Sequence, residues 1–284
     1  MIEQFIEALA YQPIQRAAIA SVLCGASCSL LSVFVVLMKM PLIGVSMSHA
    51  AFAGAVLGML LDIDPFLSGL IACLLTAGVL GPLSDRTDMA PENALGILFS
   101  FLMGIAFLGL GILTRTKAGA LNLMWGSLLS LSGADIAVLT AVTFLLSLFI
   151  ILFFKEIRSV LFNRRLAAAS GVPERPIYYA LLFLTGAVVS SNLATVGGLL
   201  IFALLVQPGA TALQLTYDLK HFFIISVLAG VGACILGLIA SYVFDLPCGA
   251  AVVLVATAIF AAAFAFSPKR RRVKPKKEEK EAHP

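Results

Sequence analysis

One histidine inside an apolar stretch is the residue whose type and position best suggest chemistry. His49 lies within residues 39–58, directly after Ser48 and three residues after Ser46, and it is the only one of three histidines inside a hydrophobic segment. An ionisable side chain at membrane depth is costly, and it therefore indicates a functional site. We predict that the helix carrying His49, Ser46 and Ser48 lines a transport path.

The residues around His49 are small or uncharged. Val45 lies one helical turn before His49 and therefore on the same helix face, so it belongs to the predicted path but offers no oxygen ligand. Small side chains allow membrane helices to approach one another closely. This stretch contains many of them: Gly44, Ala50, Ala51, Ala53, Gly54 and Gly58.

The composition is that of an all-α polytopic membrane protein. The hydrophobic fraction is 61% and the charged fraction is 12%, whereas a typical soluble domain has about 25% charged residues. Apolar runs of about 18 residues or more recur along the chain, and each can cross a bilayer roughly 30 Å thick. The short alternating segments of a membrane β-barrel do not occur.

The apolar runs predict nine spans, which form one domain over residues 14–266 after a short amphipathic segment, 1–13. Residues 119–132 would add a tenth crossing, but fourteen helical residues rise only about 21 Å. We expect a re-entrant or interfacial helix there, with eight to ten spans as the possible range. The predicted spans are about 14–38, 43–61, 66–83, 93–113, 134–154, 177–192, 194–213, 221–243 and 247–266.

Basic residues indicate which face is cytoplasmic. The tail 267–284 carries eight Lys or Arg and three Glu, whereas the rest of the chain holds eleven basic and twelve acidic residues. By the positive-inside rule, a basic run directly after a span lies in the cytoplasm. Nucleic-acid binding is the other interpretation of such a run, and the adjacent span argues against it. We expect a multi-pass membrane protein with a cytoplasmic C-terminus.

The polar stretch between the fifth and sixth spans is a second informative element. Within residues 158–172, Asn163 is suited to cap a short helix and Gly171 to end it. A capped helix at the cytoplasmic face can dock a soluble subunit, although an ordinary solvated loop helix fits the same residues. The helix would also contain Arg164, Arg165 and Ala167.

Two further sites would interrupt a helix. Gly197 and Gly198 lie toward the outer end of one predicted span, and Pro208 lies nearer its inner end. Broken helices persist in membranes where neighbouring groups or water satisfy the freed backbone. We predict hinges at these three residues, while close packing explains them equally well.

Several kinds of chemistry lack their motifs. The sequence has no GxxxxGK[ST] loop for ATP phosphates and no HExxH or GxSxG motif. The five cysteines form no CxxC pair, and Cys24 and Cys28, one turn apart, are interpreted as packing residues. We therefore expect a non-catalytic chain that binds no cofactor of its own.

Four segments together resemble the permease subunits of zinc-, manganese- and iron-type ABC importers. The resemblance implies a type II ABC importer fold in a prokaryotic inner (plasma) membrane, with a divalent transition-metal ion as the transported substrate. It implies three partners: a second copy of the chain, an ATPase subunit docked on residues 163–171, and an extracytoplasmic metal-binding protein. The segments occur in family order across about residues 14–265 and are Met40–Gly58, Pro91–Ile97, Arg165–Val172 and Val196–Ala212.

Two positions depart from the family pattern. Members commonly carry an aspartate where this chain has Val45, and they often begin the docking helix with an acid where it has Asn163. Two copies of His49 near the axis of a dimer would suit zinc, copper, nickel or iron better than manganese. Candidate acids near the outer face, which can also be read as solvated turn residues, are Asp62, Asp64 and Asp135.

Three alternatives remain open: an ABC permease for a non-metal cargo, a secondary transporter driven by an ion gradient, and an intramembrane enzyme. A secondary transporter would use paired acids within its spans, and no predicted span carries an acid near its middle. An intramembrane hydrolase would need a nucleophile with a base, and His49 with nearby serines supplies too little.

Overall fold

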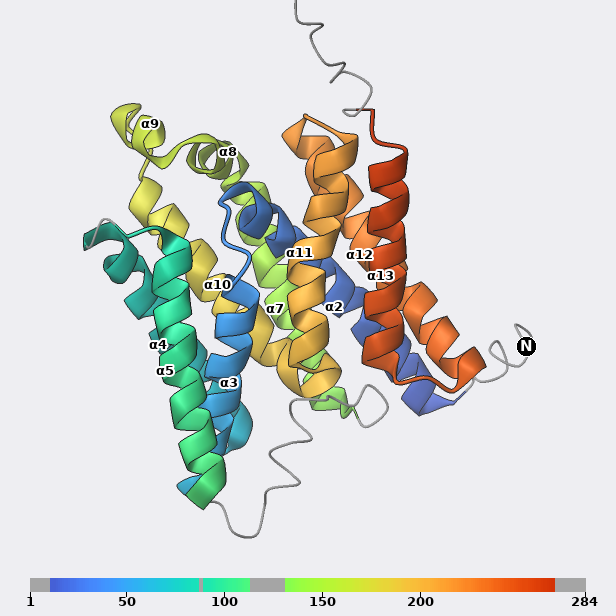
Figure 1. Ribbon diagram of the computed structural model, residues 1–284. Coiled ribbons are helices and arrows are strands. Elements are labelled where there is room, and N and C mark those ends of the chain that lie inside the picture. Colours follow the sequence, from blue (N-terminus) through green and yellow to red (C-terminus); the bar gives the residue numbers. More distant parts are fainter. Residues whose placement is uncertain (1–10, 87–88, 113–130, 269–284) are drawn as a thin grey trace, which may run out of the picture.

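The protein is a bundle of membrane-length helices (Figure 1). The structure, a computed structural model, describes residues 11–86, 89–112 and 131–268. Within these residues the helices are α2 (Gln12–Leu37), α3 (Ile43–Leu60), α4 (Pro65–Arg86), α5 (Pro91–Ile112), α7 (Gly133–Leu152), α8 (Phe154–Phe162), α9 (Arg164–Ala169), α10 (Glu174–Val196), α11 (Gly198–Leu215), α12 (Leu219–Phe244) and α13 (Cys248–Ala265).

Nine of these helices coincide with the nine predicted spans. Eight of them are long and apolar enough to cross a membrane, and α11 contains a shorter apolar stretch, Leu200–Leu215. The end of α5 and the start of α7 lie at the same end of the bundle (Figure 1), as the nine-span order requires. The predicted helix at 119–132 falls almost wholly outside the described residues, as do most of segment 1–13 and the tail from 269 onward.

Three helices form the centre of the bundle. In α2, α3 and α10, 67%, 72% and 67% of the residues in the most apolar window are buried. In α5, α7 and α13 the corresponding shares are 22%, 17% and 22%, so these helices present apolar side chains outward. An outward apolar surface is what a lipid environment requires of peripheral spans. The helix that carries His49 is therefore an inner one.

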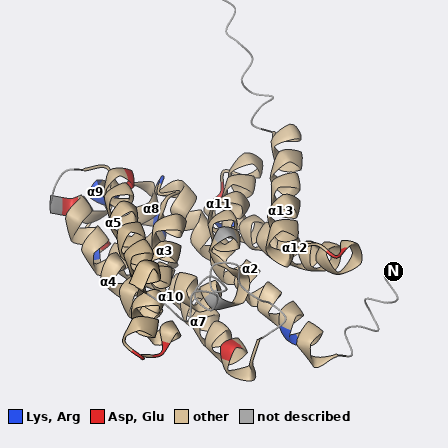
Figure 2. Cartoon of the chain, turned by 60° about the horizontal axis from the view of Figure 1, so that its bottom comes forward, with Lys and Arg blue, Asp and Glu red and all other residues tan. Residues whose placement is uncertain are grey.

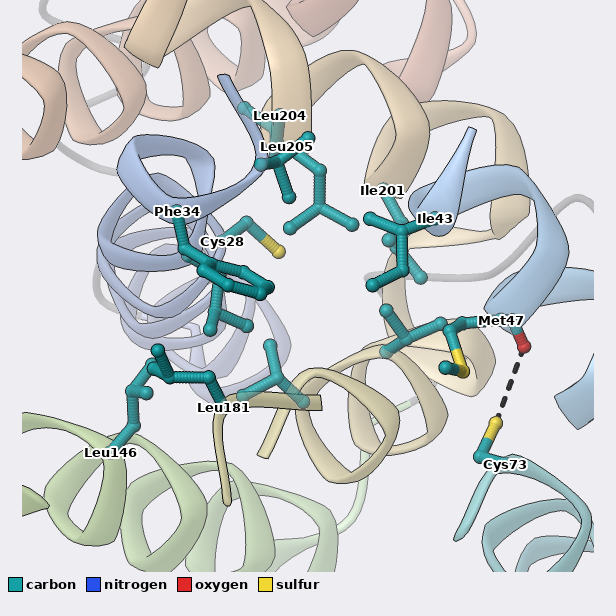
Figure 3. Packing of buried hydrophobic residues seen from close by; sticks show 14 of the residues in the cluster. Cys28, Phe34, Ile43, Met47, Cys73, Leu146, Leu181, Ile201, Leu204 and Leu205 are labelled. Atoms are coloured by element: carbon teal, nitrogen blue, oxygen red, sulfur yellow. Dashed lines mark hydrogen bonds between the residues drawn. The ribbon is translucent and has the colours of Figure 1, made fainter. Parts of the chain in front are cut away.

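The core between the central helices is filled by aliphatic and aromatic side chains. Phe34 of α2, Met47 of α3 and Leu181 of α10 are almost fully buried, and Figure 3 shows them converging with residues of α11. The thiol of Cys73 in α4 donates to the Met47 carbonyl oxygen at 3.2 Å (Figure 3). This core ties α3 to its neighbours on several sides.

Small residues bring α3 and α4 into backbone contact. A Cβ added at Gly54 would lie 2.5 Å from the Ser68 carbonyl oxygen and 2.5 Å from the Ala72 Cβ. A Cβ added at Gly69 would lie 2.9 Å from the Ala51 carbonyl oxygen. Contacts this short leave no room for a side chain. The glycines of the His49 helix therefore serve its close packing against α4.

Charged residues lie near the ends of the helices (Figure 2). One such group lies where α4 ends, α9 runs and α10 begins, at the upper end of the bundle in Figure 1. At the opposite end, the Arg16 guanidinium donates to the Leu131 carbonyl oxygen at 3.2 Å. This distribution leaves the middle of the bundle apolar, as a membrane-spanning fold requires.

Candidate functional site

His49 is half-buried in α3, and its ring is oriented by the helix backbone. Its Nδ1 lies 2.9 Å from the Val45 carbonyl oxygen. A carbonyl oxygen only accepts, so this bond assigns the proton of the neutral ring to Nδ1 and leaves the lone pair on Nε2. The Phe99 ring of α5 meets the imidazole edge-on, with centroids 5.0 Å apart. His49 therefore presents an oriented nitrogen that is able to bind a metal ion.

Ser46 and Ser48 contact two different helices. The buried Ser46 hydroxyl donates to the Leu95 carbonyl oxygen of α5 at 3.1 Å. Ser48 is also buried, and it packs against the start of α11, where a Cβ added to Gly198 would lie 3.5 Å from the Ser48 Cβ. Successive helix residues point about 100° apart, so neighbours in sequence need not share a face. Ser46 and His49 both face α5, where they contact Leu95 and Phe99, whereas Ser48 faces α11.

The described residues supply no complete metal site. They contain no group of three or more His, Cys, Asp or Glu side chains that could hold a metal ion. A small cavity between α3, α4 and α10 is lined mostly by apolar residues, and His49 is not among its lining residues.

The three candidate acids lie in turns and at helix starts. Asp64 accepts from the Leu67 backbone N–H at 2.8 Å at the start of α4. Asp135 forms a capping box with Ser132 at the start of α7. Asp62 has a positive φ of 54° in the turn between α3 and α4. Asp64 and Asp135 thus form hydrogen bonds typical of helix starts, which agrees with their interpretation as turn residues.

The predicted interruption between α10 and α11 is present at Gly197. This residue has φ 80° and ψ 157°, a backbone conformation that is essentially restricted to glycine. Pro208 lies inside α11, which continues through it. The next residue, Gly209, donates its backbone N–H to the Ser32 hydroxyl of α2 at 2.8 Å, which fastens this part of α11 to the core. The role of these residues as hinges stays a prediction.

The helix predicted around Asn163 is α9, a single short element at one end of the bundle. The Asn163 side chain caps it by accepting from the Leu166 backbone N–H at 3.1 Å. Gly171 follows with φ 80°, the left-handed conformation that ends helices. Ala167 is buried, whereas Arg165 and Leu166 are exposed. The helix thus offers one outer face for docking, and its docking role stays a prediction.

Arg164 fastens α9 to the ends of two membrane helices. Its guanidinium lies 3.0 Å from Asp85 Oδ1 of α4 and 2.9 Å from Glu174 Oε2 of α10. Its Cζ lies 3.9 Å from the ring centroid of Tyr178. Burial by itself would lower the pKa of Arg164, but the hydrogen bonds to Asp85 and Glu174 outweigh it and raise that pKa above its usual value. Arg164 therefore stays charged at any physiological pH.

Sequence reasoning missed the partners of Arg164. Asp85 lies 79 residues earlier in the chain and Glu174 lies ten residues later. Each occurs in a polar loop beside an apolar run, where charged residues are common and carry no distinguishing pattern. The buried aromatic residue under Arg164 is Tyr178, which stands directly before a second tyrosine, Tyr179, at the start of a span and has no distinguishing pattern either. Only the packing of α4, α9 and α10 brings these groups together.

Comparison with known proteins identifies the fold and the family. The sequence profile of the ABC 3 transport family matches residues 10–267. The chain belongs to the ABC 3 transport family. This membership confirms the resemblance that the four sequence segments indicated, and it confirms the all-helical permease fold.

Relatives within the ABC 3 transport family cover nearly the whole chain. A protein of Halalkalibacterium halodurans described as "Manganese transport system membrane protein MntC" is 32% identical over 94% of this chain and 91% of its own. A Haemophilus influenzae protein described as "Probable iron transport system membrane protein" is 31% identical over 96% of this chain and 100% of its own.

Solved structures that are similar to this chain include one chain of "PsaBC from Streptococcus pneumoniae in complex with Fab". It superposes with a TM-score of 0.85 at 28% identity and covers 96% of this chain and 98% of that one. A chain described as an inward-facing "putative metal-chelate type ABC transporter" has a TM-score of 0.76 at 15% identity, with 93% and 90% coverage, and shares the fold.

Proposed function

We propose that the chain is the non-catalytic permease subunit of an ATP-driven importer of divalent transition-metal ions, with manganese or iron as the cargo. Membership of the ABC 3 transport family is the observation that carries this proposal. Several relatives are named for manganese or iron transport. A permease of this kind takes its driving force from a separate ATPase, consistent with the lack of a phosphate-binding loop in the sequence.

His49 is the proposed contact with the ion. Its backbone-oriented ring, with Nε2 not engaged by that backbone contact, has the properties of an imidazole ligand, and its side chain is only half-buried. Val45 shares the helix face of His49, but its side chain has no oxygen. An aspartate at position 45 would supply a second ligand beside the imidazole, which Val45 cannot do. A second copy of the chain would bring another His49, and we propose a homodimer for this reason.

The end of the bundle that carries α8 and α9 is proposed to face the cytoplasm. In the nine-span order, three of the nineteen Lys and Arg residues lie on the opposite side, namely Arg16, Arg115 and Lys117, which leaves sixteen on this one. The positive-inside rule favours that orientation. The exposed face of α9 would then receive the ATPase, and a metal-binding protein would deliver the ion at the other end.

Metal uptake tests the function and the role of His49 together. Cells expressing the whole system would be offered manganese, iron and zinc separately, with the unsubstituted chain, His49→Ala and Val45→Asp. We expect ATP-dependent uptake by the unsubstituted chain and loss of most uptake in His49→Ala, because the imidazole ligand is gone. Val45→Asp adds a carboxylate one turn away and should favour manganese.

A matched control separates the ligand role from packing. Phe99→Leu removes the ring that meets His49 but leaves the imidazole, and it should transport close to normally. Normal uptake by a well-assembled His49→Ala variant would show that His49 is a packing residue. Uptake by the purified chain alone under an ion gradient would instead support a secondary transporter.

A further inference from the structure

Arg164 forms the most extensive polar connection between α9 and the membrane helices among the described residues. Its guanidinium binds one carboxylate on α4 and one on α10, and it stacks on a tyrosine ring of α10. About a fifth of the side-chain surface of Arg164 and of Asp85 is exposed, at 22% and 23%, and Glu174 is less exposed at 14%. Partly buried ion pairs such as these are screened less by salt than fully exposed pairs.

A second set of contacts continues from Tyr178 toward the His49 helix. Tyr178 is fully buried, and its hydroxyl lies 3.7 Å from the Met40 sulfur. Its ring also packs on Phe34 of α2, with centroids 6.2 Å apart. Met40 is fully buried in the short turn that joins α2 to α3. A displacement of Tyr178 would therefore reach the start of α3 directly.

The contacts of Arg164 with α4 also lead to α3. Asp85 lies at the end of α4, where it also accepts from the Tyr179 hydroxyl at 3.0 Å. Further along, α4 is in backbone contact with α3 at Gly54 and Gly69. Both partners of Arg164 thus belong to helices that pack on α3. The α9 helix itself has six residues and packs mainly on α8 and the start of α10.

We propose that Arg164, with Asp85, Glu174 and Tyr178, transmits movement of α9 to α4 and α10 and through them to α3. The inference rests on the proposed function, since it takes α9 as the site at which an ATPase pulls. A guanidinium suits this role because its planar fork binds two carboxylates while its face stacks on a ring. A lysine at this position would keep the charge but lose the fork and the stacking. Arg164 is thus a positioning residue that acts through the helices.

The test measures coupling separately from docking. The permease with its ATPase would be reconstituted with Arg164→Gln and with Arg175→Gln as the matched control. Arg175 has the same charge and lies near Glu174 at 3.7 Å, but its side chain is 73% exposed, so its loss should change little. For Arg164→Gln we expect normal co-purification of the ATPase and continued ATP hydrolysis, with about tenfold fewer ions moved per ATP, an ordinary coupling between contacting residues.

Two outcomes would overturn the proposal. One is a normal number of ions per ATP in Arg164→Gln. The other is loss of the ATPase from a well-folded Arg164→Gln permease, because Arg164 would then serve docking. If Arg164→Gln does not fold, Asp85→Asn is measured in the same assay. It must also lower the number of ions moved per ATP. If both fold, their double variant should be no worse than Arg164→Gln alone, which a purely additive structural effect would not produce.

A distance measurement keeps this inference separate from the proposed cargo. Spin labels would be placed at two exposed positions, Leu61→Cys after α3 and Leu254→Cys in α13, with the native cysteines replaced. ATP should change their separation in the otherwise unsubstituted protein and with Arg175→Gln, but not with Arg164→Gln. Equal changes in all three, or none in any, would refute transmission through Arg164. Absence of metal uptake with an intact distance change would refute the cargo alone.

Discussion

At the scale of single residues, backbone conformation distinguishes two adjacent glycines. Gly197 adopts φ 80° and ψ 157°, which a residue with a Cβ rarely reaches. Gly198 begins α11, and a Cβ added there would lie 3.5 Å from Leu193 Cδ1 and 3.5 Å from Ser48 Cβ, an ordinary contact distance. The two positions look alike in the sequence and differ in what they tolerate.

We expect Gly197→Ala to destabilise the protein by about 1–3 kcal/mol, the usual cost of a strained backbone conformation. Gly198→Ala, the matched control, should be close to neutral. Thermal unfolding of the purified proteins in one detergent checks both. Equal unfolding temperatures for the two variants would contradict the assignment of the interruption to Gly197.

At the scale of elements, the sequence predicted the nine membrane helices and the capped helix after Asn163, because apolar length and cap residues are local signals. It could not predict that Ser46 and Ser48 contact α5 and α11, since those contacts depend on how helices pack. The Arg164 cluster was missed for the same reason, because its acids come from separate loops. Whether His49 binds an ion remains a prediction.

The cap of α9 gives a prediction at this scale. Helices this short are only marginally stable in isolation, so each capping hydrogen bond contributes noticeably to their stability. Asn163→Ala removes the acceptor for the Leu166 N–H and should cost about 1 kcal/mol, which raises local amide exchange about fivefold. Hydrogen–deuterium exchange of residues 164–169 measures it. Asn163→Asp keeps an acceptor, and its amide exchange should match that of the unsubstituted chain. If exchange in Asn163→Ala also matched the unsubstituted chain, Asn163 would not act as a cap.

At the scale of the whole molecule, the nine-span order places the end of α5 and the end of α7 on opposite sides of the membrane. A ten-span order would place both on the cytoplasmic side. The described helices fit nine, since α5 ends and α7 begins at the same end of the bundle (Figure 1). The orientation of that bundle in the membrane follows from the basic residues.

Reporter fusions in a Gram-negative host test this arrangement. Alkaline phosphatase fused after Ile112 should be active, because this enzyme works only outside the cytoplasm, and a fluorescent protein fused after Leu152 should fluoresce. The second fusion is the control, since both orders place Leu152 inside. An inactive phosphatase at Ile112 would favour ten spans.

The backbone contact between α3 and α4 has a consequence for kinetics. Because no side chain separates them at Gly54 and Gly69, the two helices cannot slide apart without breaking a close-packed seam. In the proposed transport mechanism, exposure of His49 to either side of the membrane would then be a joint displacement of α3 and α4. Collective movements of that size occur in microseconds to milliseconds, far more slowly than the rotation of an exposed side chain. The close contacts at Gly54 and Gly69 would then limit the rate at which the proposed transport path opens.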